Sequence, residues 1–527
     1  MKGNMFMKSL VIIIIILFIE AYFINLGAVE NNKQFNFQIR DNQTINNLNG
    51  LSDLTDNLQV KNPKFELPEW GGAMVHSDPH QSDSINLTVP TTNVKMVWHK
   101  NQRYGERFGT RGNGIAGNGK IAACSFGYPL CRDNLIIYNY EGTRKWESDG
   151  LLNGFAMFST PMVDIHNRII ACDNKKILMI DLDDIDNDGN PANPEKHIDW
   201  ITDLPPLHGV PFSPSITENG VIILPISGGV LPRYGACIYS FDIDGQFLDC
   251  IEFDGYGNFN MNSACVDENR VYVLVVRNQL PISQSRLYAI DVDTDGTLTI
   301  VWYYEFDGMS QATPLFIDGT LYFDSCIEIM PDKDPHIIAI DDNGNNYNVK
   351  WVKSLSPYYN RTWFSFSYDP RGGFWYLDSK GKKIVRFSTE NGNPIEEILI
   401  ADIVQEPWPI NTKYKPSSCI TICESDTNLI LIVSARVTYD LWNLYNNYVL
   451  AINLSDNSLL WKVEVDESED SGNFANGQYT ILMDEYRKNH RLVFGTCCDG
   501  VMAIGANDLC CFPAGTKITM ADGTYKN

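Results

Sequence analysis

One acidic stretch, residues 184–195, has the residue types and spacing of a calcium-binding loop. Its sequence, DIDNDGNPANPE, matches the twelve-residue pattern D-x-[DN]-x-[DN]-G-x5-E, in which oxygen ligands surround one hard cation and a glycine makes the sharp turn. The predicted ligands are Asp184, Asp186, Asp188, Asn190 and Glu195. Strands rather than helices are expected on both sides. The alternative is a solvated acidic turn, because Asp and Gly are common turn residues.

A second candidate for chemistry lies at the C-terminal end, where Cys510 and Cys511 precede a short strand pattern and a turn. From Cys511 onward, the sequence CFPAGTKITMADGT resembles the opening motif of Hint domains, the hedgehog/intein self-processing module. The resemblance implies that the Cys511 thiolate attacks the carbonyl of Cys510 and converts an amide into a thioester. Residues 511–527 match only the start of such a domain, without its later Thr-x-x-His and His-Asn motifs. We therefore expect the chain as given to be inactive in splicing and cleavage.

The elements that would hold these residues are short strands, and residues 287–306 show the repeating unit. The sequence LYAIDVDTDGTLTIVWYYEF alternates between two faces, turns at DTDG, and continues as a second strand with Trp302 near its middle. The acidic run 291–296 lacks the closing acid of a calcium loop, because Trp302 occupies that place, and we interpret it as a turn. Similar hairpins end at Trp146, Trp351 and Trp461.

These terminal strands recur about 50 residues apart, a period typical of propeller blades. They contain Trp98, Trp146, Trp200, Trp302, Trp351 and Trp461, and strands without Trp fill the places at 248–253 and 396–400. The strand Val94–Trp98 precedes any group of shorter strands, and the last group, residues 477–505, has no Trp strand after it. We therefore predict an all-β, eight-bladed β-propeller in which the N-terminal strand completes the last blade, so that no sheet edge stays unpaired.

The repeats resemble the pyrroloquinoline-quinone-type (PQQ-like) propeller repeat. In that family a strand ending LYALD leads through a TG turn to a Trp that docks on the neighbouring blade. Residues 287–291, LYAID, and residues 450–453, LAIN, fit this pattern, and WGGAMVHSDP at 70–79 resembles the lead-in of such proteins. The resemblance covers roughly residues 70–505. The family includes quinone-dependent dehydrogenases and non-catalytic binding scaffolds, among them the outer-membrane assembly lipoprotein, so the fold does not decide the function.

The adjacent Cys497 and Cys498 leave a quinone cofactor as an alternative. Some of the dehydrogenases carry a vicinal disulfide over the cofactor, together with a Trp platform and Glu, Asn and Asp ligands to calcium. No match for that set is found in register, so PQQ is not expected, and the two cysteines are interpreted as strand residues on opposite faces. The eight His are scattered without HxH or HExxH spacing, and His76 and His80 fall in the lead-in segment.

The chain has 13 cysteines, and two interpretations of them stay open. Cys124 and Cys131 flank an apparent hairpin tip, and Cys419 and Cys423 are close in sequence, so an exported location would permit disulfides. The other interpretation is that most are small core residues. It is favoured for the cysteines inside apolar strand runs, which are Cys172, Cys237, Cys265 and Cys326.

The net charge and the N-terminal residues limit which partners and which location are expected. The formal net charge of −24 argues against nucleic acid and anionic membrane surfaces, which need clustered Lys and Arg. The opening MKGNMFMK followed by SLVIIIIILFI is typical of a secretory signal with cleavage near Ala28. Leu10–Ile19 is too short to span a bilayer alone. An uncleaved signal anchor is the alternative, and it is the one membrane contact we expect.

The sequence thus predicts four parts. They are a signal peptide or anchor (1–28), an Asn-rich linker and lead-in (29–92), the propeller (93–508) and the start of a Hint domain (511–527). We expect a secreted or cell-surface scaffold that binds a protein or other macromolecule through its loops or central funnel, with Hint cleavage or splicing at Cys511 in a longer chain. The alternatives are a PQQ-dependent dehydrogenase-like quinoprotein and a toxin-delivery scaffold that releases a C-terminal payload.

Overall fold

The computed structural model describes residues 64–100, most of residues 115–506, and the pairs 518–519 and 525–526. The chain divides into two compact units, residues 1–63 and residues 64–527, and every described residue belongs to the second. Several predicted features lie outside the described residues: the signal segment, the calcium loop 184–195, Cys326, the pair Cys497-Cys498, and Cys510 and Cys511. No helix among the described residues is long and apolar enough to cross a membrane.

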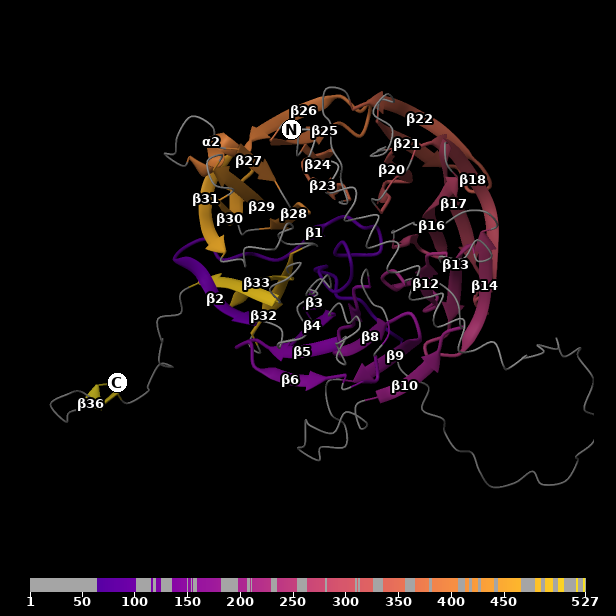
Figure 1. Cartoon of the computed structure of the whole chain (residues 1–527), viewed down its shortest axis with the longest axis horizontal. Helices are drawn as coiled ribbons and strands as arrows, with labels where there is room; N and C mark the ends of the chain where they lie inside the picture. Colours follow the sequence, from indigo (N-terminus) through magenta and orange to yellow (C-terminus); the bar gives the residue numbers. More distant parts are fainter. Residues whose placement is uncertain are drawn as a thin grey trace, which may run out of the picture. The chain divides into compact units, whose positions relative to one another are not determined.

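Antiparallel strands build sheets that follow one another in chain order around a ring (Figure 1). In the described part of the ring, seven sheets have four strands and one has six. The first comprises β3 (Ile115–Ala116), β4 (Lys120–Cys124), β5 (Leu135–Asn139) and β6 (Arg144–Glu147). The second comprises β7 (Met162–Val163), β8 (Arg168–Cys172), β9 (Lys176–Asp181) and β10 (Ile198–Asp203). The third comprises β11 (Ser215–Ile216), β12 (Ile222–Ile226), β13 (Ala236–Phe241) and β14 (Phe247–Phe253).

Three more four-stranded sheets continue the ring. One comprises β15 (Cys265–Asp267), β16 (Arg270–Gln279), β17 (Ile282–Val292) and β18 (Leu298–Asp307). The next comprises β19 (Leu315–Ile317), β20 (Thr320–Asp324), β21 (His336–Asp342) and β22 (Tyr347–Ser354). Then follow β23 (Ser367–Tyr368), β24 (Phe374–Asp378), β25 (Lys383–Phe387) and β26 (Pro394–Leu399), after which the single helical turn α2 (Ile400–Val404) leads onward.

The six-stranded sheet differs from the others by two added strands. Its core is β28 (Thr421–Glu424), β29 (Leu429–Tyr439), β30 (Leu444–Asn453) and β31 (Ser458–Val465). β27 (Lys413–Pro416) pairs with β29, and β1 (Ser84–Ile85) pairs parallel with β28. Separately, β35 (Ile518–Thr519) and β36 (Tyr525–Lys526) form a small hairpin near the C-terminus.

The last sheet of the ring joins both parts of the chain, as the sequence predicts. It contains β32 (Thr480–Met483), β33 (His490–Gly495), β34 (Val501–Ala506) and, as its outer strand, β2 (Val94–Lys100). β2 runs antiparallel to β34, from Val94 opposite Ala506 to Lys100 opposite Val501. The predicted closure by the N-terminal strand is therefore confirmed, and it removes an unpaired edge from this sheet.

The hydrophobic core lies between the sheets. Inner strands such as β12 are buried at every residue, whereas the outer strand β10 alternates between half-buried and exposed positions. A buried hydrophobic cluster joins each sheet to the next around the ring; one example contains Ile223 of β12 and Ile290 of β17. Strands that are covered on both faces need continuous apolar runs, and this is why the central strands lack strict alternation.

Tryptophans on the outer strands lock neighbouring sheets together. The indole N–H of Trp200 in β10 donates to the carbonyl of Ile243 at 2.8 Å, and its ring covers Gly245 in the turn between β13 and β14. Trp98 and Trp351 repeat the bond to the carbonyls of Tyr140 and Thr389. The docking of each Trp on the adjacent blade, which the family resemblance implies, is thus seen at these positions.

Where the outer strand lacks Trp, a smaller side chain takes its place. Leu248 in β14 packs on Gly296, in the turn between β17 and β18. Gly296 has φ +84°, a conformation that glycine adopts without steric cost, and Asp295 accepts a hydrogen bond from the Thr297 N–H in the same turn. The turn predicted within residues 291–296 is confirmed from Asp293 to Gly296, whereas Asp291 and Val292 end β17.

The segment before β2 lies in the middle of the ring (Figure 1). Its backbone carbonyls accept hydrogen bonds from inner strands of successive sheets: Val163 N–H donates to Ala73, Val266 to Pro79, Phe316 to His80, Tyr368 to Ser82 and Ile422 to Asp83. Phe65, at the end of the stretch predicted as a linker, is buried with Met74 in the cluster between the second and third sheets. We call residues 64–86 the central segment.

Candidate metal centre

Three side chains with ligating atoms meet at the centre of the ring. His76 and Asp83 come from the central segment, and Cys419 lies two residues before β28. The ligating atoms of all three lie within 4.8 Å of one another, and all three residues are buried. His76 Nδ1 is 2.8 Å from Asp83 Oδ2.

The local fold of the central segment brings His76 and Asp83 together. The Asp83 N–H donates to the His76 carbonyl at 2.9 Å, and the Gly72 N–H donates to the Ser77 carbonyl at 2.8 Å, so the chain doubles back on itself. Four residues that are not glycine have left-handed backbone conformations here: His76 (φ 54°), Ser77 (φ 76°), Gln81 (φ 61°) and Asp83 (φ 50°). Such conformations persist only where the surrounding contacts hold them in place.

Burial sets the protonation of this cluster. Removal from water raises the pKa of the Asp83 carboxyl, although the nearby His76 opposes the rise. Burial, reinforced by the Asp83 charge, raises the pKa of the Cys419 thiol well above its ordinary value. Asp83 Oδ1 is buried and has no hydrogen-bond partner, so one carboxyl oxygen is left without compensation for its lost hydration.

Ser365 Oγ lies 3.1 Å from His76 Nε2, so Ser365, His76 and Asp83 form a chain of side-chain contacts. The hydroxyl also accepts the Thr313 N–H at 3.0 Å. Ser213 accepts the Thr160 N–H in the same way at 2.9 Å, so the Ser365 bond to Thr313 belongs to the propeller repeat. Ser365 is 8% exposed, and we therefore assign it a structural role rather than that of a nucleophile.

A cysteine nucleophile is equally disfavoured at this place. Reactive cysteines are partly exposed and have a lowered thiol pKa. Cys419 is 3% exposed, and the pKa of its thiol is raised. The chemistry that suits buried imidazole, carboxylate and thiol groups side by side is metal coordination.

A second polar feature is a recess of about 790 Å³ among the turns of three neighbouring sheets. Carboxylates dominate its lining: Asp267, Glu268, Asp291, Asp293, Asp295 and Asp342. Arg270 is the one basic residue of the lining, and it pairs with Asp291 at 2.6 Å and with Asp342 at 2.9 Å. The recess therefore has a negative balance of charge that favours cationic groups.

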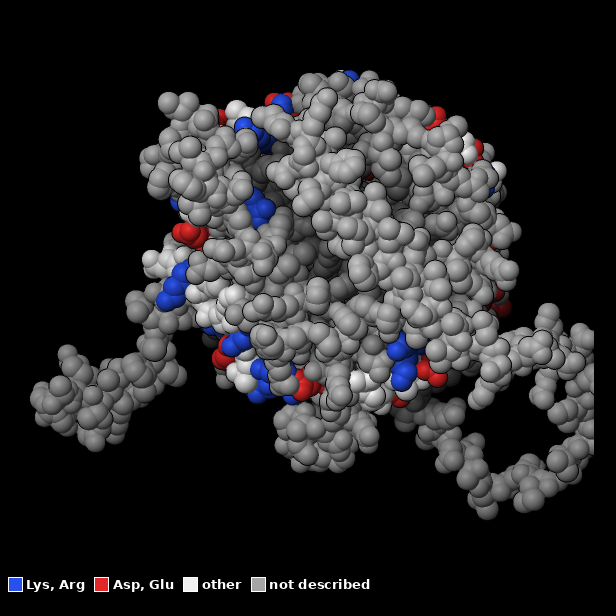
Figure 2. Space-filling model, in the orientation of Figure 1, with Lys and Arg blue, Asp and Glu red and all other residues white. Residues whose placement is uncertain are grey.

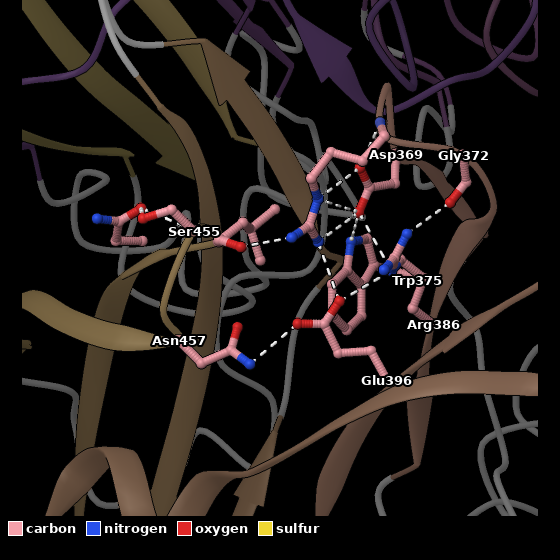
Figure 3. Close-up of polar contacts among 10 residues, drawn as sticks. Asp369, Gly372, Trp375, Arg386, Glu396, Ser455 and Asn457 are labelled. Carbon is pink, nitrogen blue, oxygen red and sulfur yellow. Dashed lines mark hydrogen bonds and ion pairs between the residues drawn. The ribbon is translucent and has the colours of Figure 1, made fainter.

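A third polar cluster connects the β23–β26 sheet to the six-stranded sheet (Figure 3). Asp369, which is fully buried, accepts hydrogen bonds from Arg371 and from the Trp375 indole N–H at 2.9 Å. Arg371 also donates to the Leu454 carbonyl. The positive and negative charges of this cluster pair with one another, and we interpret the cluster as a structural link between two sheets.

In the view of Figure 2, described side chains of both charges are interspersed around the rim.

The sequence predictions for the cysteines can be compared with the described part of the chain. Cys172, Cys237 and Cys265 are buried strand residues, as predicted. Cys419 and Cys423, for which a disulfide was an open interpretation, are buried and do not form one. The side chains of Cys124 and Cys131 lie outside the described residues.

Sequence reasoning assigned no role to the His76, Asp83 and Cys419 cluster. His76 was noted only as part of the lead-in segment, and Cys419 lies more than 300 residues away, so no local spacing joins them. One signal was available: a segment with two His and two Asp within eight residues, 76–83, stands directly before the repeats.

The chain was compared with known protein families, curated proteins and solved structures. No family model matches the chain, and no curated protein matches it. Among solved structures, the β-propeller domain of Cps50 (Swd1) from Myceliophteria thermophila is similar, with 9% identity, a TM-score of 0.35, and coverage of 77% of this chain and 98% of that domain. Apo AztD from Citrobacter koseri shows 12% identity, a TM-score of 0.38, and coverage of 68% and 87%.

A protein of unknown function from Bacteroides caccae is also similar, with 12% identity, a TM-score of 0.30, and coverage of 55% of this chain and 90% of that one. These likenesses concern the fold alone and carry no argument about function. The ring of sheets itself defines the class of this protein as an all-β propeller.

Proposed function

We propose that this chain is an exported, non-catalytic propeller scaffold that counts eight blades, with the six-stranded sheet as one of them. It binds a macromolecular partner through turns on one face of the ring. Propeller folds commonly present such turns to other proteins. The proposal of export is supported by the N-terminal basic and apolar residues, MKGNMFMK and SLVIIIIILFI.

The observation that carries the binding proposal is the acidic recess. Its six carboxylates face one arginine, which is already paired, so a ligand with several positive charges gains favourable electrostatic energy there. The part of the partner that enters the recess is a Lys- or Arg-rich segment. His80 of the central segment lies 3.1 Å from Asp267, a lining residue, so the recess reaches the centre of the ring.

The test measures binding of a synthetic Arg-rich peptide to the whole chain by calorimetry at low salt. Asp295→Asn removes one charge from the recess and retains the oxygen that accepts the Thr297 N–H. The matched control is Asp456→Asn, because Asp456 Oδ1 accepts the Ser458 N–H at 3.0 Å in the corresponding turn between β30 and β31. We expect Kd to rise about 3-fold for Asp295→Asn, the size of one exposed charge pair. An equal effect of the control would show that only net charge matters and would refute the proposed site.

Two further parts of the proposal rest on sequence. Residues from Cys511 are proposed to begin a Hint module with Cys511 as nucleophile and the Cys510 carbonyl as its target, because the run CFPAGTKITMADGT matches the opening motif. In a longer chain that carries the whole module, Cys511→Ala is expected to abolish self-cleavage, and unchanged processing would contradict this role. Residues 184–195 are proposed to bind calcium, and isothermal titration with Ca²⁺ tests it, with Glu195→Gln expected to weaken binding.

A further inference from the structure

We propose that His76, Asp83 and Cys419 bind a divalent transition metal ion, with Zn²⁺ as the expected ion, at the centre of the ring. The ligand set combines imidazole nitrogen, carboxylate oxygen and thiolate sulfur. This mixture suits Zn²⁺ and related borderline ions, whereas Ca²⁺ and Mg²⁺ prefer oxygen ligands alone. The site is separate from the acidic recess and from the calcium loop, and it does not depend on the proposed function.

The spacing of the three ligating atoms is compatible with three corners of a tetrahedral site. Zn²⁺ bonds of about 2.0 Å to nitrogen and oxygen and about 2.3 Å to sulfur place neighbouring ligand atoms about 3.3–3.7 Å apart. The three ligating atoms here lie within 4.8 Å of one another, and His76 Nδ1 and Asp83 Oδ2 are 2.8 Å apart. Side-chain shifts of about 1 Å or less therefore suffice, and no movement of the strands is required.

The unsatisfied oxygen of Asp83 is an independent observation that points to a ligand. Asp83 is fully buried, and its Oδ1 has no hydrogen-bond partner. Buried polar atoms in folded proteins almost always have a partner, so an exception indicates either strain or a missing ion. A metal ion bound by this carboxylate would supply the missing contact.

The charges balance when the ion is bound. A neutral imidazole, one carboxylate and one thiolate carry a total charge of −2, which a divalent cation cancels, so the filled buried site has no net charge. Binding breaks the Cys419 S–H bond and forms a metal–sulfur bond, and the released proton leaves to solvent. No oxidant or reductant takes part.

The second nitrogen of His76 already has the partner that a metal-bound histidine needs. With Nδ1 on the metal, Nε2 carries the hydrogen, and the Nε2–H donates a hydrogen bond to Ser365 Oγ, 3.1 Å away. Such a bond fixes the ring orientation and the tautomer of a ligating histidine. Ser365 is itself held by the Thr313 N–H, so the orientation of His76 is coupled to the backbone of two sheets.

The bound ion would fasten the central segment to the ring. His76 and Asp83 belong to that segment, while Cys419 leads into β28 of the six-stranded sheet. The backbone bond from the Ile422 N–H to the Asp83 carbonyl, 2.9 Å long, joins the same two parts. Metal binding would therefore stabilise the centre of the propeller rather than perform a reaction.

The experiment uses the untagged whole chain, produced once with Zn²⁺ and once with Co²⁺ in the growth medium. Elemental analysis is expected to find one Zn²⁺ or one Co²⁺ ion per chain after dialysis, and the Co²⁺ form is expected to show a thiolate-to-cobalt absorption band in the near ultraviolet. Cys419→Ala is expected to abolish the band. Cys423→Ala is the matched control, because Cys423 is a buried cysteine four residues further on, in β28, outside the cluster, and it should leave the band unchanged.

Asp83→Asn provides a second variant, which keeps the size of the side chain and removes its charge. We expect it to retain the circular dichroism spectrum of the propeller and to lower the metal content at least tenfold at the same free metal concentration. The proposal is overturned if the unchanged chain carries no metal above the level of the buffer, or if the thiolate band persists in Cys419→Ala. It is also overturned if Asp83→Asn folds and retains full metal content.

Discussion

The contact between Trp200 and Gly245 gives the sharpest test of how the blades are joined. A Cβ atom added at Gly245 would lie 2.3 Å from Cε3 of the Trp200 ring, and Gly245 has φ +78°. Gly245→Ala therefore carries two costs. The left-handed backbone costs about 1 kcal/mol for alanine, and displacement of the indole costs about 1–3 kcal/mol. The expected loss is about 2–4 kcal/mol in the free energy of unfolding.

Gly344→Ala separates the two costs. Gly344 lies in the corresponding turn between β21 and β22, has φ +85°, and a Cβ atom there meets nothing within 4 Å. It should lose only the backbone cost of about 1 kcal/mol. Both values come from urea unfolding followed by circular dichroism, where a change in midpoint at constant slope reports stability.

A double-mutant cycle then isolates the contact itself. In a Trp200→Ala background the indole is gone, so Gly245→Ala should cost about 1 kcal/mol, and the coupling between the two positions should be about 1–3 kcal/mol. If Gly245→Ala costs no more than Gly344→Ala, or if the coupling is absent, the indole does not pack on this turn in solution and the docking argument is wrong.

Three further predictions concern burial and charge. Asp369→Asn should lower the free energy of unfolding by about 2–3 kcal/mol, because it removes the charge of a fully buried carboxylate that accepts from Arg371. Urea unfolding measures this, and a loss below about 0.5 kcal/mol would contradict the link between the two sheets. Burial raises the pKa of the Cys172 thiol to about 12, so iodoacetamide at pH 8 should modify the exposed Cys250 before Cys172 in the native protein. Mass spectrometry measures the two rates, and equal rates would contradict the burial of Cys172. Met74→Ala in the central segment should cost about 2–4 kcal/mol by thermal or urea unfolding, and a neutral effect would mean that this segment is not packed in the ring.

The repeats were predictable because the same contact is made many times. At several junctions a large side chain on an outer strand packs on a glycine in a turn of the next sheet. Trp200 on Gly245 and Leu248 on Gly296 are two examples, and such pairs recur along the chain at a regular spacing. The closure by Val94–Trp98 followed from the phase of that spacing. A contact that is repeated from blade to blade therefore appears as a regular spacing of residues in the sequence.

The candidate metal centre lacks any such regularity. His76 and Asp83 meet because the chain doubles back between them, and Cys419 reaches them only through the parallel pairing of β1 with β28. Left-handed conformations at residues other than glycine carry no sequence signature. The two added strands of the six-stranded sheet, β1 and β27, were missed for the same reason, since they occur once.

The junction where the ring closes shows how the central segment and the closing strand depend on each other. The Trp98, Trp200 and Trp351 indoles each donate to a turn between the third and fourth strands of the next sheet. In the last sheet β34 and β2 are not consecutive, so that turn does not exist. Trp461 in β31 donates instead to the Pro90 carbonyl at 2.8 Å, and His490 contacts Thr88 in the same stretch. The residues that connect β1 to β2 thus replace the missing turn. A change that pulls β2 from β34 would also disturb the partner of Trp461 and the central segment, so closure of the ring and filling of its centre are structurally coupled.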